Sequence, residues 1–420
     1  MIVLSGASLV LPDRVLSPGT LVIEDGRIAE IRSDAPSGGH AAFAFHGHYI
    51  VPGFIDVHVH GVDGIDALDP LPGDGAVAAI AARMPRYGVT AFCPTTVACG
   101  PAALRRVLDQ VRHARATPAP RSARVLPAHL ESNFINPAYS GAQPPGCLRT
   151  PRAALGAGGA ATGAVGTEGD TDGNDCSAEP AGFTAADILA EIERATPDVG
   201  IVTLASELDG GLDLVRRLAA RGHLVSLGHS AATYEEALAA IAAGARQATH
   251  LFNRMPPLGH RAPGLVGAVL QTDEVAAEII CDGVHVHPAL IRTAIAAKRP
   301  SRILAITDAT AAAGLPAGSR AMLGGRSITA GAQTALLPDG TIAGSVLTMD
   351  RAFQTLIARV GLAVVDAATI CATSPARELG LAGLGILARE AVADLVVLDA
   401  NFSVVQTYVA GQLVYARGTV

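Results

Sequence analysis

Eight apolar, strand-like runs alternate with alanine-rich helical stretches through the middle of this 420-residue chain, and this alternation constrains its fold more than any other feature. Strands are predicted at 54–60, 89–94, 125–131, 200–205, 224–228, 247–250, 278–285 and 303–308. Helices are predicted at 74–87, 102–115, 212–221, 234–243 and 288–298. Eight β/α repeats over roughly 250 residues have the size of a (β/α)8 TIM barrel, which we assign to residues 53–374. A doubly wound sheet is the alternative, but no Gly-x-Gly-x-x-Gly motif follows the first strand.

Short strand patterns occur at both ends of the chain. A hairpin is predicted at 21–31, with its turn at Asp25-Gly26. Near the other end, strand patterns at 393–398, 404–409 and 412–415 surround a turn at Gly411. Because chain termini often lie close together, residues 1–52 and 375–420 are expected to form one small β-sandwich domain.

Residues 151–182 interrupt the barrel pattern with a glycine- and alanine-rich stretch, followed by Asp170, Asp172 and Asp175. The spacing of these acidic residues does not match a calcium loop, and no glutamate closes one. We predict a mobile, low-complexity loop inserted after the third strand.

Composition excludes several classes of partner. The net charge of −7 argues against a nucleic-acid surface. No apolar run approaches the length of a membrane span, and no basic segment of a signal peptide precedes residue 20. The six cysteines lack Cys-x-x-Cys spacing, which is typical of free thiols in a reducing compartment. We therefore expect a cytoplasmic protein that binds neither nucleic acid nor membrane.

The single lysine, Lys298, lies at the end of a predicted helix just before a proline. This position argues against reactions that need a lysine, such as Schiff-base formation. It also argues against a metal site bridged by a carbamylated lysine. Any bound anion must instead be held by arginine, histidine or backbone N–H groups.

Histidines and carboxylates stand at the predicted C-terminal ends of the strands, where barrel enzymes place their chemistry. His58 and His60 lie two apart on a strand, so both imidazoles point to the same side. Further strands end at Glu131, His229, His250, His285 and Asp308. Each alone could be a core residue, which is the interpretation we prefer for His129 and His223, but together they indicate one site.

Five of these residues carry nitrogen or oxygen donors suited to zinc or iron: His58, His60, Glu131, His229 and His250. They could hold one ion or two, with Glu131 bridging a pair. A metal-bound water has a pKa lowered towards about 7 and becomes a nucleophile. Asp308 would take the proton of that water as general base and pass it to the leaving group as general acid.

Longer motifs surround these residues. They are PGFIDVHVHG at 52–61, LGHS at 227–230, THLFN at 249–253, MPPL at 255–258, RAPG at 261–264, DGVHV at 282–286, TDA at 307–309 and AGSVLTMD at 343–350. On these motifs the chain resembles the amidohydrolase superfamily, and within it the N-acetylglucosamine-6-phosphate deacetylases. The resemblance covers nearly the whole chain except residues 151–182.

The resemblance implies hydrolysis of the acetamide of N-acetylglucosamine 6-phosphate to glucosamine 6-phosphate and acetate, a step of amino-sugar catabolism. It also implies a homodimer whose subunits combine a barrel with a small β-sandwich. Because this chain keeps both His58 and His60, a site for two metal ions is consistent with the family. The phosphate contacts of the family map onto Asn253, Arg261 and His285.

Four positions depart from the family pattern. Ser132 and Asn133 replace a Gly-Pro pair after the third strand. Gln143 stands where relatives commonly place a histidine that contacts the substrate carbonyl; glutamine donates a hydrogen bond but cannot become cationic. Arg254 stands where relatives often have alanine, and either adds a phosphate contact or points to solvent.

Two alternatives remain open. The chain could be a related amidohydrolase acting on N-acetylgalactosamine 6-phosphate or on another N-acyl substrate, such as an N-acyl amino acid. It could also be a scaffold without activity, which predicts loss of metal ligands; all five ligands and Asp308 are present.

Overall fold

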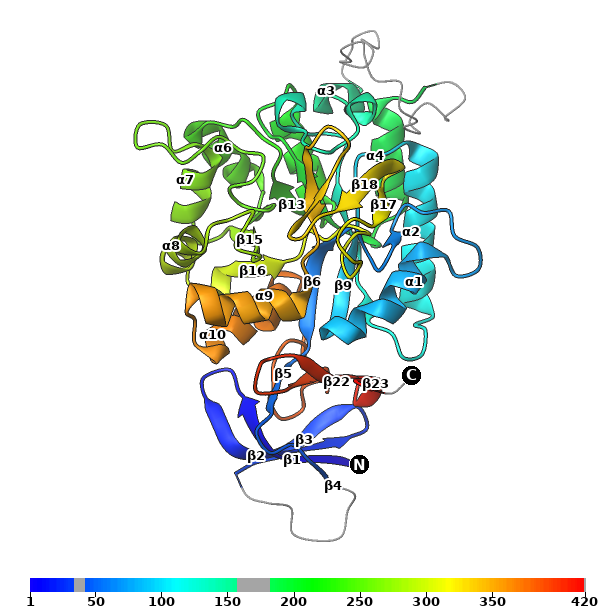
Figure 1. The fold of residues 1–420 in the computed structure, drawn as a ribbon. Coiled ribbons are helices and arrows are strands. Elements are labelled where there is room, and N and C mark those ends of the chain that lie inside the picture. Colours follow the sequence, from blue (N-terminus) through cyan, green and yellow to red (C-terminus); the bar gives the residue numbers. More distant parts are fainter. Residues whose placement is uncertain (34–41, 157–181, 419–420) are drawn as a thin grey trace.

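The computed structural model describes residues 1–33, 42–156 and 182–418, and Figure 1 shows a barrel surrounded by helices above a smaller β-sheet. Eight strands follow one another around the barrel, all pairing in parallel. They are β6 (Phe54–Val59), β9 (Val89–Thr96), β11 (Ala128–Glu131), β12 (Val199–Leu204), β13 (Leu224–Leu227), β14 (Gln247–Ala248), β15 (Ala276–Ile280) and β16 (Ile303–Ile306). The predicted (β/α)8 barrel is confirmed.

Closure of the barrel joins its last strand to its first. Beyond the end of β16, the backbone N–H of Asp308 donates to the His58 carbonyl at 2.9 Å, and that of His60 donates to the Ala309 carbonyl at 2.8 Å. The ends of β6 and β16 are therefore hydrogen-bonded to each other, which brings both histidines next to Asp308.

The helices of the repeats surround the barrel (Figure 1). The five predicted helices correspond to α1 (Gly75–Arg83) continued by the 3-10 helix η1 (Met84–Tyr87), α2 (Pro101–Ala116), α5 (Gly211–Ala220), α6 (Tyr234–Ala243) and α8 (Pro288–Lys298). Further α-helices among the described residues lie outside the predicted set, including α4 (Ala185–Arg194), α7 (Gly264–Gln271), α9 (Met349–Thr355), α10 (Val364–Ala368) and α11 (Ser374–Glu378). Helix α6 begins with a capping box between Thr233 and Glu236, a local signal that fixes its first residue.

Six predicted strands agree with the observed ones to within two residues at each end, and the other two differ more. The third is divided into β10 (Arg124–Val125) and β11, because Pro127 has no N–H to donate to a ladder. The seventh ends at Ile280 and does not reach His285. Beyond it, the side chain of Asp282 accepts hydrogen bonds from the N–H groups of Val284 and His285, which makes a turn and stops the strand.

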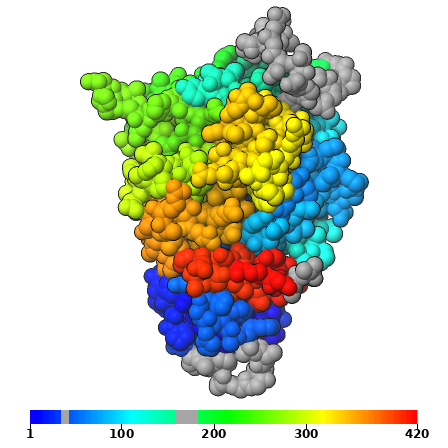
Figure 2. All heavy atoms as spheres, viewed as in Figure 1, coloured from blue at the N-terminus to red at the C-terminus, as the bar shows by residue number. Residues whose placement is uncertain are grey.

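A four-stranded antiparallel sheet follows β16 and is absent from the prediction. Its strands are β17 (Arg320–Leu323), β18 (Arg326–Ala330), β19 (Thr334–Leu336) and β20 (Ile342–Ser345). Gly324 and Gly325, with φ of +55° and +85°, form the tight turn between β17 and β18. The segment lies on the face of the molecule that Figure 2 shows, where it is coloured yellow.

The two ends of the chain meet in one eight-stranded sheet. The first segment supplies β1 (Ile2–Val10), β2 (Val15–Glu24), β3 (Arg27–Arg32), β4 (Ala42–Ala44) and β5 (Tyr49–Pro52), and the last supplies β21 (Leu395–Leu398), β22 (Val404–Val409) and β23 (Gln412–Ala416). Strands β5 and β21 pair antiparallel and join the two segments. The sheet has its own hydrophobic core, which includes Leu4, Leu21 and Tyr408.

The predicted insertion and the cysteines depart from expectation. Residues 151–154 form the short helix α3 (Pro151–Ala154) instead of a loop, and residues 157–181 lie outside the described part of the chain. Cys93, Cys281 and Cys371 are buried free thiols as predicted. Cys147 is disulfide-bonded, so the expectation that all six are free is wrong. No helix within the described residues has the length and apolarity needed to cross a membrane.

Candidate active site at the barrel mouth

Six predicted site residues lie together at the C-terminal ends of the strands: His58, His60, Glu131, His229, His250 and Asp308. All six are buried, with exposures from 0% to 9%. Three of them follow strands β13, β14 and β16 with positive φ values: +47° for His229, +32° for His250 and +47° for Asp308. Side chains other than glycine rarely adopt this conformation, and it costs roughly 1–3 kcal/mol where it occurs. Each turn directs a functional group into the barrel mouth, so the strain occurs at the site.

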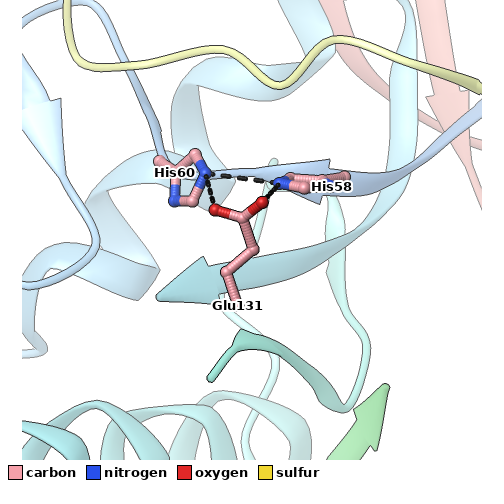
Figure 3. A group of neighbouring side chains, drawn as sticks. All are labelled: His58, His60 and Glu131. Carbon is pink, nitrogen blue, oxygen red and sulfur yellow. Dashed lines mark hydrogen bonds and ion pairs between the residues drawn. The ribbon is translucent and has the colours of Figure 1, made fainter. Parts of the chain in front are cut away.

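A first group of donor atoms joins the end of β6 to β11, as Figure 3 shows for His58, His60 and Glu131. The Nε2 atoms of His58 and His60 are 3.3 Å apart, and lie 3.6 and 3.5 Å from the two carboxylate oxygens of Glu131. The Oδ1 atom of Asp308 lies 3.4 Å from the Nε2 of His58 and 3.2 Å from that of His60. Asp308 is thus a fourth donor in this group as well as a candidate base.

A second group shares Glu131 with the first. Its Oε1 atom lies 3.0 Å from the Nε2 of His229 and 2.9 Å from that of His250. These two Nε2 atoms are 3.0 Å apart. Glu131 therefore stands between two groups of imidazoles, as expected for a bridging carboxylate.

The spacing of these atoms fits divalent metal ions. A tetrahedral ion with bonds of about 2.0 Å holds its ligand atoms about 3.3 Å apart, close to the separations in both groups. Within the described residues, the Nδ1 atoms of His60 and His250 are buried without a hydrogen-bond partner. Imidazole nitrogens that face each other, next to carboxylates, are a donor set that a metal ion would complete.

Electrostatics in the first group favours an added positive charge. Burial lowers the pKa of His58 to about 4, so its imidazole is neutral. Burial also acts to lower the pKa of His60, but hydrogen bonds with Asp308 and Glu131 outweigh it and raise that pKa to about 10. The carboxylates of Asp308 and Glu131 thus keep His60 protonated. A metal cation bound between these groups would take the place of that proton.

A cavity of about 440 Å³ opens beside the donors, a size that accommodates a small ligand. Four of the residues predicted to bind substrate line it: Gln143, Asn253, Arg254 and His285. Arg261 does not line it; this residue is exposed, and its Nη1 atom lies 2.8 Å from the Nε2 of His260. In a single chain, Arg261 is therefore away from the other predicted substrate contacts.

Gln143 has a different set of contacts from the one implied by the resemblance. Its Oε1 atom accepts a hydrogen bond from the Ala98 N–H at 2.7 Å. Its Nε2 donates to the carboxylate of Glu131. With both ends of the amide engaged, Gln143 orients Glu131.

Two further departures from the family pattern, Ser132 and Asn133, lie outside the cavity. Ser132 Oγ donates to the Thr203 carbonyl at 2.5 Å. The side-chain amide of Asn133 donates to the carbonyls of Cys99 and Cys147 at 2.8 and 2.7 Å. Neither residue lines the cavity. Both side chains instead donate hydrogen bonds to nearby backbone carbonyls.

Of two further histidines near the strand ends, His285 lines the cavity and His129 lies in the core. His285 is held by Asp282, whose Oδ2 lies 2.6 Å from Nδ1, and its Nε2 is buried without a hydrogen-bond partner in the described part of the chain. His129 uses both ring nitrogens, at 2.9 Å from the Val57 carbonyl and 2.8 Å from the Thr203 hydroxyl. The preferred structural interpretation of His129 therefore agrees with its contacts.

Sequence reasoning missed three contributors to the site. The Tyr139 carbonyl lies 2.7 Å from His229 Nδ1, and Leu323 and Ile342 from the unpredicted sheet line the cavity. Glu278 lies 3.0 Å from His58 Nδ1. Only Glu278 had a visible signal, because it is the single charged residue in the apolar run 275–280.

Comparison with known proteins agrees with this geometry. The amidohydrolase family model matches residues 49–414. The chain is 35% identical to human N-acetylglucosamine-6-phosphate deacetylase over 428 residues, covering 98% of this chain and 94% of the human protein. It is 33% identical to the N-acetylgalactosamine-6-phosphate deacetylase of Escherichia coli O157:H7 over 365 residues, 87% of each chain.

A solved structure of similar fold comes from Mycobacterium smegmatis. It is a variant of N-acetyl-D-glucosamine-6-phosphate deacetylase in complex with N-acetyl-D-glucosamine 6-phosphate. It aligns with a TM-score of 0.84 at 30% identity and covers 99% of both chains. The barrel, the mouth and nearly all of the small sheet lie within these matches, and the chain belongs to the amidohydrolase family.

Proposed function

We propose that this protein is a metal-dependent deacetylase that hydrolyses N-acetyl-D-glucosamine 6-phosphate to D-glucosamine 6-phosphate and acetate. The observation that carries the proposal is the pair of donor groups sharing Glu131 beside a cavity of about 440 Å³. The names of the relatives, which match over nearly the full length, support the same substrate.

The metal ligands in this proposal are His58, His60, Glu131, His229 and His250. A bound divalent ion, zinc or iron, would act as a Lewis acid that polarises the acetamide carbonyl and lowers the pKa of water. One or two ions per subunit fit the two groups, and the shared Glu131 favours two. The two groups of donors have separations of 2.9–3.6 Å.

Asp308 is the proposed general base and acid. Burial acts to raise its pKa, but its electrostatic interaction with the His58 imidazole and its hydrogen bond with His60 lower it below its ordinary value. The carboxylate is therefore ionised at neutral pH and can accept a proton from the attacking water. As water adds to the carbonyl carbon and the C–N bond breaks, Asp308 returns that proton to the amine.

The phosphate end of the substrate is assigned to Asn253, Arg254 and His285, which line the cavity. Arg254 supplies a cation, and His285 presents a buried Nε2 without a protein partner in the described residues. Arg261 keeps its proposed phosphate contact only if a second subunit brings it to the cavity. This requirement agrees with the proposed homodimer.

A second candidate substrate is N-acetylgalactosamine 6-phosphate. The chain is 33% identical to a deacetylase named for that epimer and 35% identical to the human enzyme named for the gluco sugar. This small difference does not separate the two epimers.

A substrate panel with metal analysis tests the proposal. The panel contains N-acetylglucosamine, its 6-phosphate and N-acetylgalactosamine 6-phosphate. We expect bound zinc or iron in freshly purified protein and the highest kcat/KM for N-acetylglucosamine 6-phosphate. A higher kcat/KM for the galacto epimer would favour the second candidate. Metal-free protein that hydrolyses none of the three would support the scaffold alternative.

Further proposals concern organisation and location. We assign residues 1–52 and 375–420 to the small domain and 53–374 to the barrel. A cytoplasmic location is supported by the buried free thiols of Cys93, Cys281 and Cys371, whereas the disulfide of Cys147 argues against it. Sedimentation and a thiol count on intact cells would test the dimer and the location.

A further inference from the structure

Glu278 is a carboxylate without a role in the proposed reaction, and it lies inside the barrel next to the candidate metal ligands. It belongs to β15, has no exposed surface, and does not line the cavity. An ionised group in an apolar strand is costly unless hydrogen bonds compensate it. The contacts of its two oxygen atoms therefore indicate what the residue is for.

One oxygen of Glu278 contacts both donor groups. Its Oε2 atom lies 3.0 Å from His58 Nδ1, in the first group. The same atom accepts a hydrogen bond from the backbone N–H of His250, in the second group, at 3.3 Å. The other oxygen, Oε1, accepts from the side-chain amide of Gln247 at 2.5 Å.

The contact with His58 determines which ring nitrogen can bind a metal. Both oxygens of Glu278 accept hydrogen bonds, from Gln247 and from His250, and in the contact with His58 the Nδ1–H donates to the same carboxylate. The lone pair of the neutral ring is then on Nε2, the atom that faces His60 and Glu131. A carboxylate that accepts from the second nitrogen of a ligand histidine commonly fixes its tautomer and orientation in metal sites.

The contact with His250 stabilises a strained turn. His250 has a φ of +32°, and its N–H points to Glu278. The next residue, Leu251, donates its N–H to the backbone carbonyl of Glu278 at 2.8 Å. The side chain and the backbone of Glu278 thus both accept hydrogen bonds from this turn, which stabilises the position of the His250 ring.

We infer that Glu278 is a positioning residue that fixes His58 and His250 together, so that the two donor groups form one preorganised metal centre. The inference rests on the proposed metal centre, which it deepens. It predicts that loss of Glu278 weakens metal binding although Glu278 itself does not touch an ion.

Zinc binding by two variants tests the inference. Glu278→Met removes the acceptor and keeps an apolar side chain of similar length. Gln247→Met is the matched control, because Gln247 is equally buried and contacts only the other oxygen of Glu278. Apoprotein of each is dialysed against a series of free zinc concentrations, bound zinc is measured by elemental analysis, and thermal unfolding verifies the fold.

We expect Glu278→Met to raise the half-saturating free zinc concentration by about 10- to 100-fold. Gln247→Met should change it by less than about 3-fold, and Glu278→Gln, which keeps an acceptor oxygen, should lie between the two. Wild-type affinity and stoichiometry in Glu278→Met would overturn the inference. Wild-type protein that binds no zinc or iron would overturn the proposed metal centre itself, which is a distinguishable failure.

A measurement on the zinc-loaded wild-type chain is decisive even where Glu278→Met does not fold. The imidazole nitrogens of His58 are observed by 15N NMR and assigned by their absence in His58→Gln. We expect a hydrogen on Nδ1 and none on Nε2. A hydrogen on Nε2 would overturn the inference.

Discussion

The two ends of the barrel both bury carboxylates, but only the base pairs one with an arginine among the described residues. At the base, Asp394 is 2% exposed and accepts from Arg124 at 3.0 and 3.2 Å and from the Ala410 N–H. At the mouth, the carboxylates of Glu131 and Asp308 face imidazoles, and the described residues place no arginine or lysine against them.

The difference separates structural charge from functional charge. The Arg124–Asp394 pair joins the barrel to the small sheet and leaves little for a ligand to satisfy. At the mouth, metal-donor atoms converge, and the described residues give the Nδ1 atoms of His60 and His250 no hydrogen-bond partner. Three of its turns also have strained backbone angles. These features cost stability unless a ligand compensates them. The same kind of residue therefore stabilises the fold at the base and is prepared for chemistry at the mouth.

The largest expected effect is loss of turnover in Asp308→Asn. Asparagine keeps an oxygen near His58 and His60 but cannot accept the proton of the attacking water. We expect kcat to fall by about 10²- to 10⁴-fold while bound metal is retained. Steady-state kinetics with elemental analysis of the same sample measures both, and a kcat near that of wild type would refute the general-base role.

Asp394→Asn makes the opposite prediction at the base. The substitution leaves Arg124 without its carboxylate partner, so the free energy of unfolding should fall by about 2–3 kcal/mol. This loss is slightly smaller than for a fully buried ion pair, because Arg124 is partly exposed. The site is remote, so kcat/KM should remain within about 2-fold of wild type. Urea unfolding and kinetics measure the two effects, and a large loss of kcat with little loss of stability would break the comparison.

Lys298 is a third case, a buried charge without a carboxylate partner in residues 1–33, 42–156 and 182–418 and without a place in the mouth. It is 1% exposed, and its Nζ donates to the Thr272 carbonyl. Burial lowers its pKa to about 8 from 10.5. Below pH 8 both folded and unfolded chains carry the proton, and the folded chain bears the cost of burying it.

Lys298→Met should therefore stabilise the protein at pH 7, by about 2 kcal/mol. Between pH 8 and 10.5 the unfolded wild type binds more protons than the folded one, so its stability rises with pH. The advantage of the variant should shrink over this window. Unfolding free energies of both proteins at pH 7, 8, 9 and 10 measure it, and an advantage that does not change with pH would contradict the burial argument.

The repeating parts of the molecule could be predicted from sequence. Strand and helix periods are local, and the barrel rule then places every strand end at one face. This rule brought His58, His60, Glu131, His229, His250 and Asp308 together although they are far apart in sequence.

The remaining parts depend on the path of loops and on partners across the barrel. The end of β15 is set by the Asp282 turn, which a run of apolar residues does not reveal. The contact of Glu278 with His58 joins β15 to β6, the strands on either side of β16, and the two residues are 220 apart in sequence, so no local pattern contains it. Arg254 and Arg261 lie on one loop, but only its course shows that Arg254 lines the cavity and Arg261 does not.

The smallest expected effect concerns Arg254. It extends the comparison of mouth and base from the buried carboxylates to a cationic side chain. Its side chain lies across Gly141, where a Cβ atom would come within 2.5 Å of the Arg254 Nε. Unlike Arg124 at the base, Arg254 has no acidic partner among the described residues, so it is available to an anion in the cavity. Arg254→Ala should raise KM about 10-fold for the phosphorylated sugar and leave KM for unphosphorylated N-acetylglucosamine unchanged, since a charge-assisted contact is worth about 1.5 kcal/mol.

Equal effects of Arg254→Ala on both sugars would show that Arg254 does not contact phosphate. Arg261→Ala is the informative companion, because in its own subunit this side chain lies away from the cavity beside His260. A rise in KM limited to the phosphorylated sugar would then mean that Arg261 reaches the cavity of a neighbouring subunit. In that case the cation that completes the mouth would come from outside the chain, whereas every partner of Asp394 at the base comes from within it.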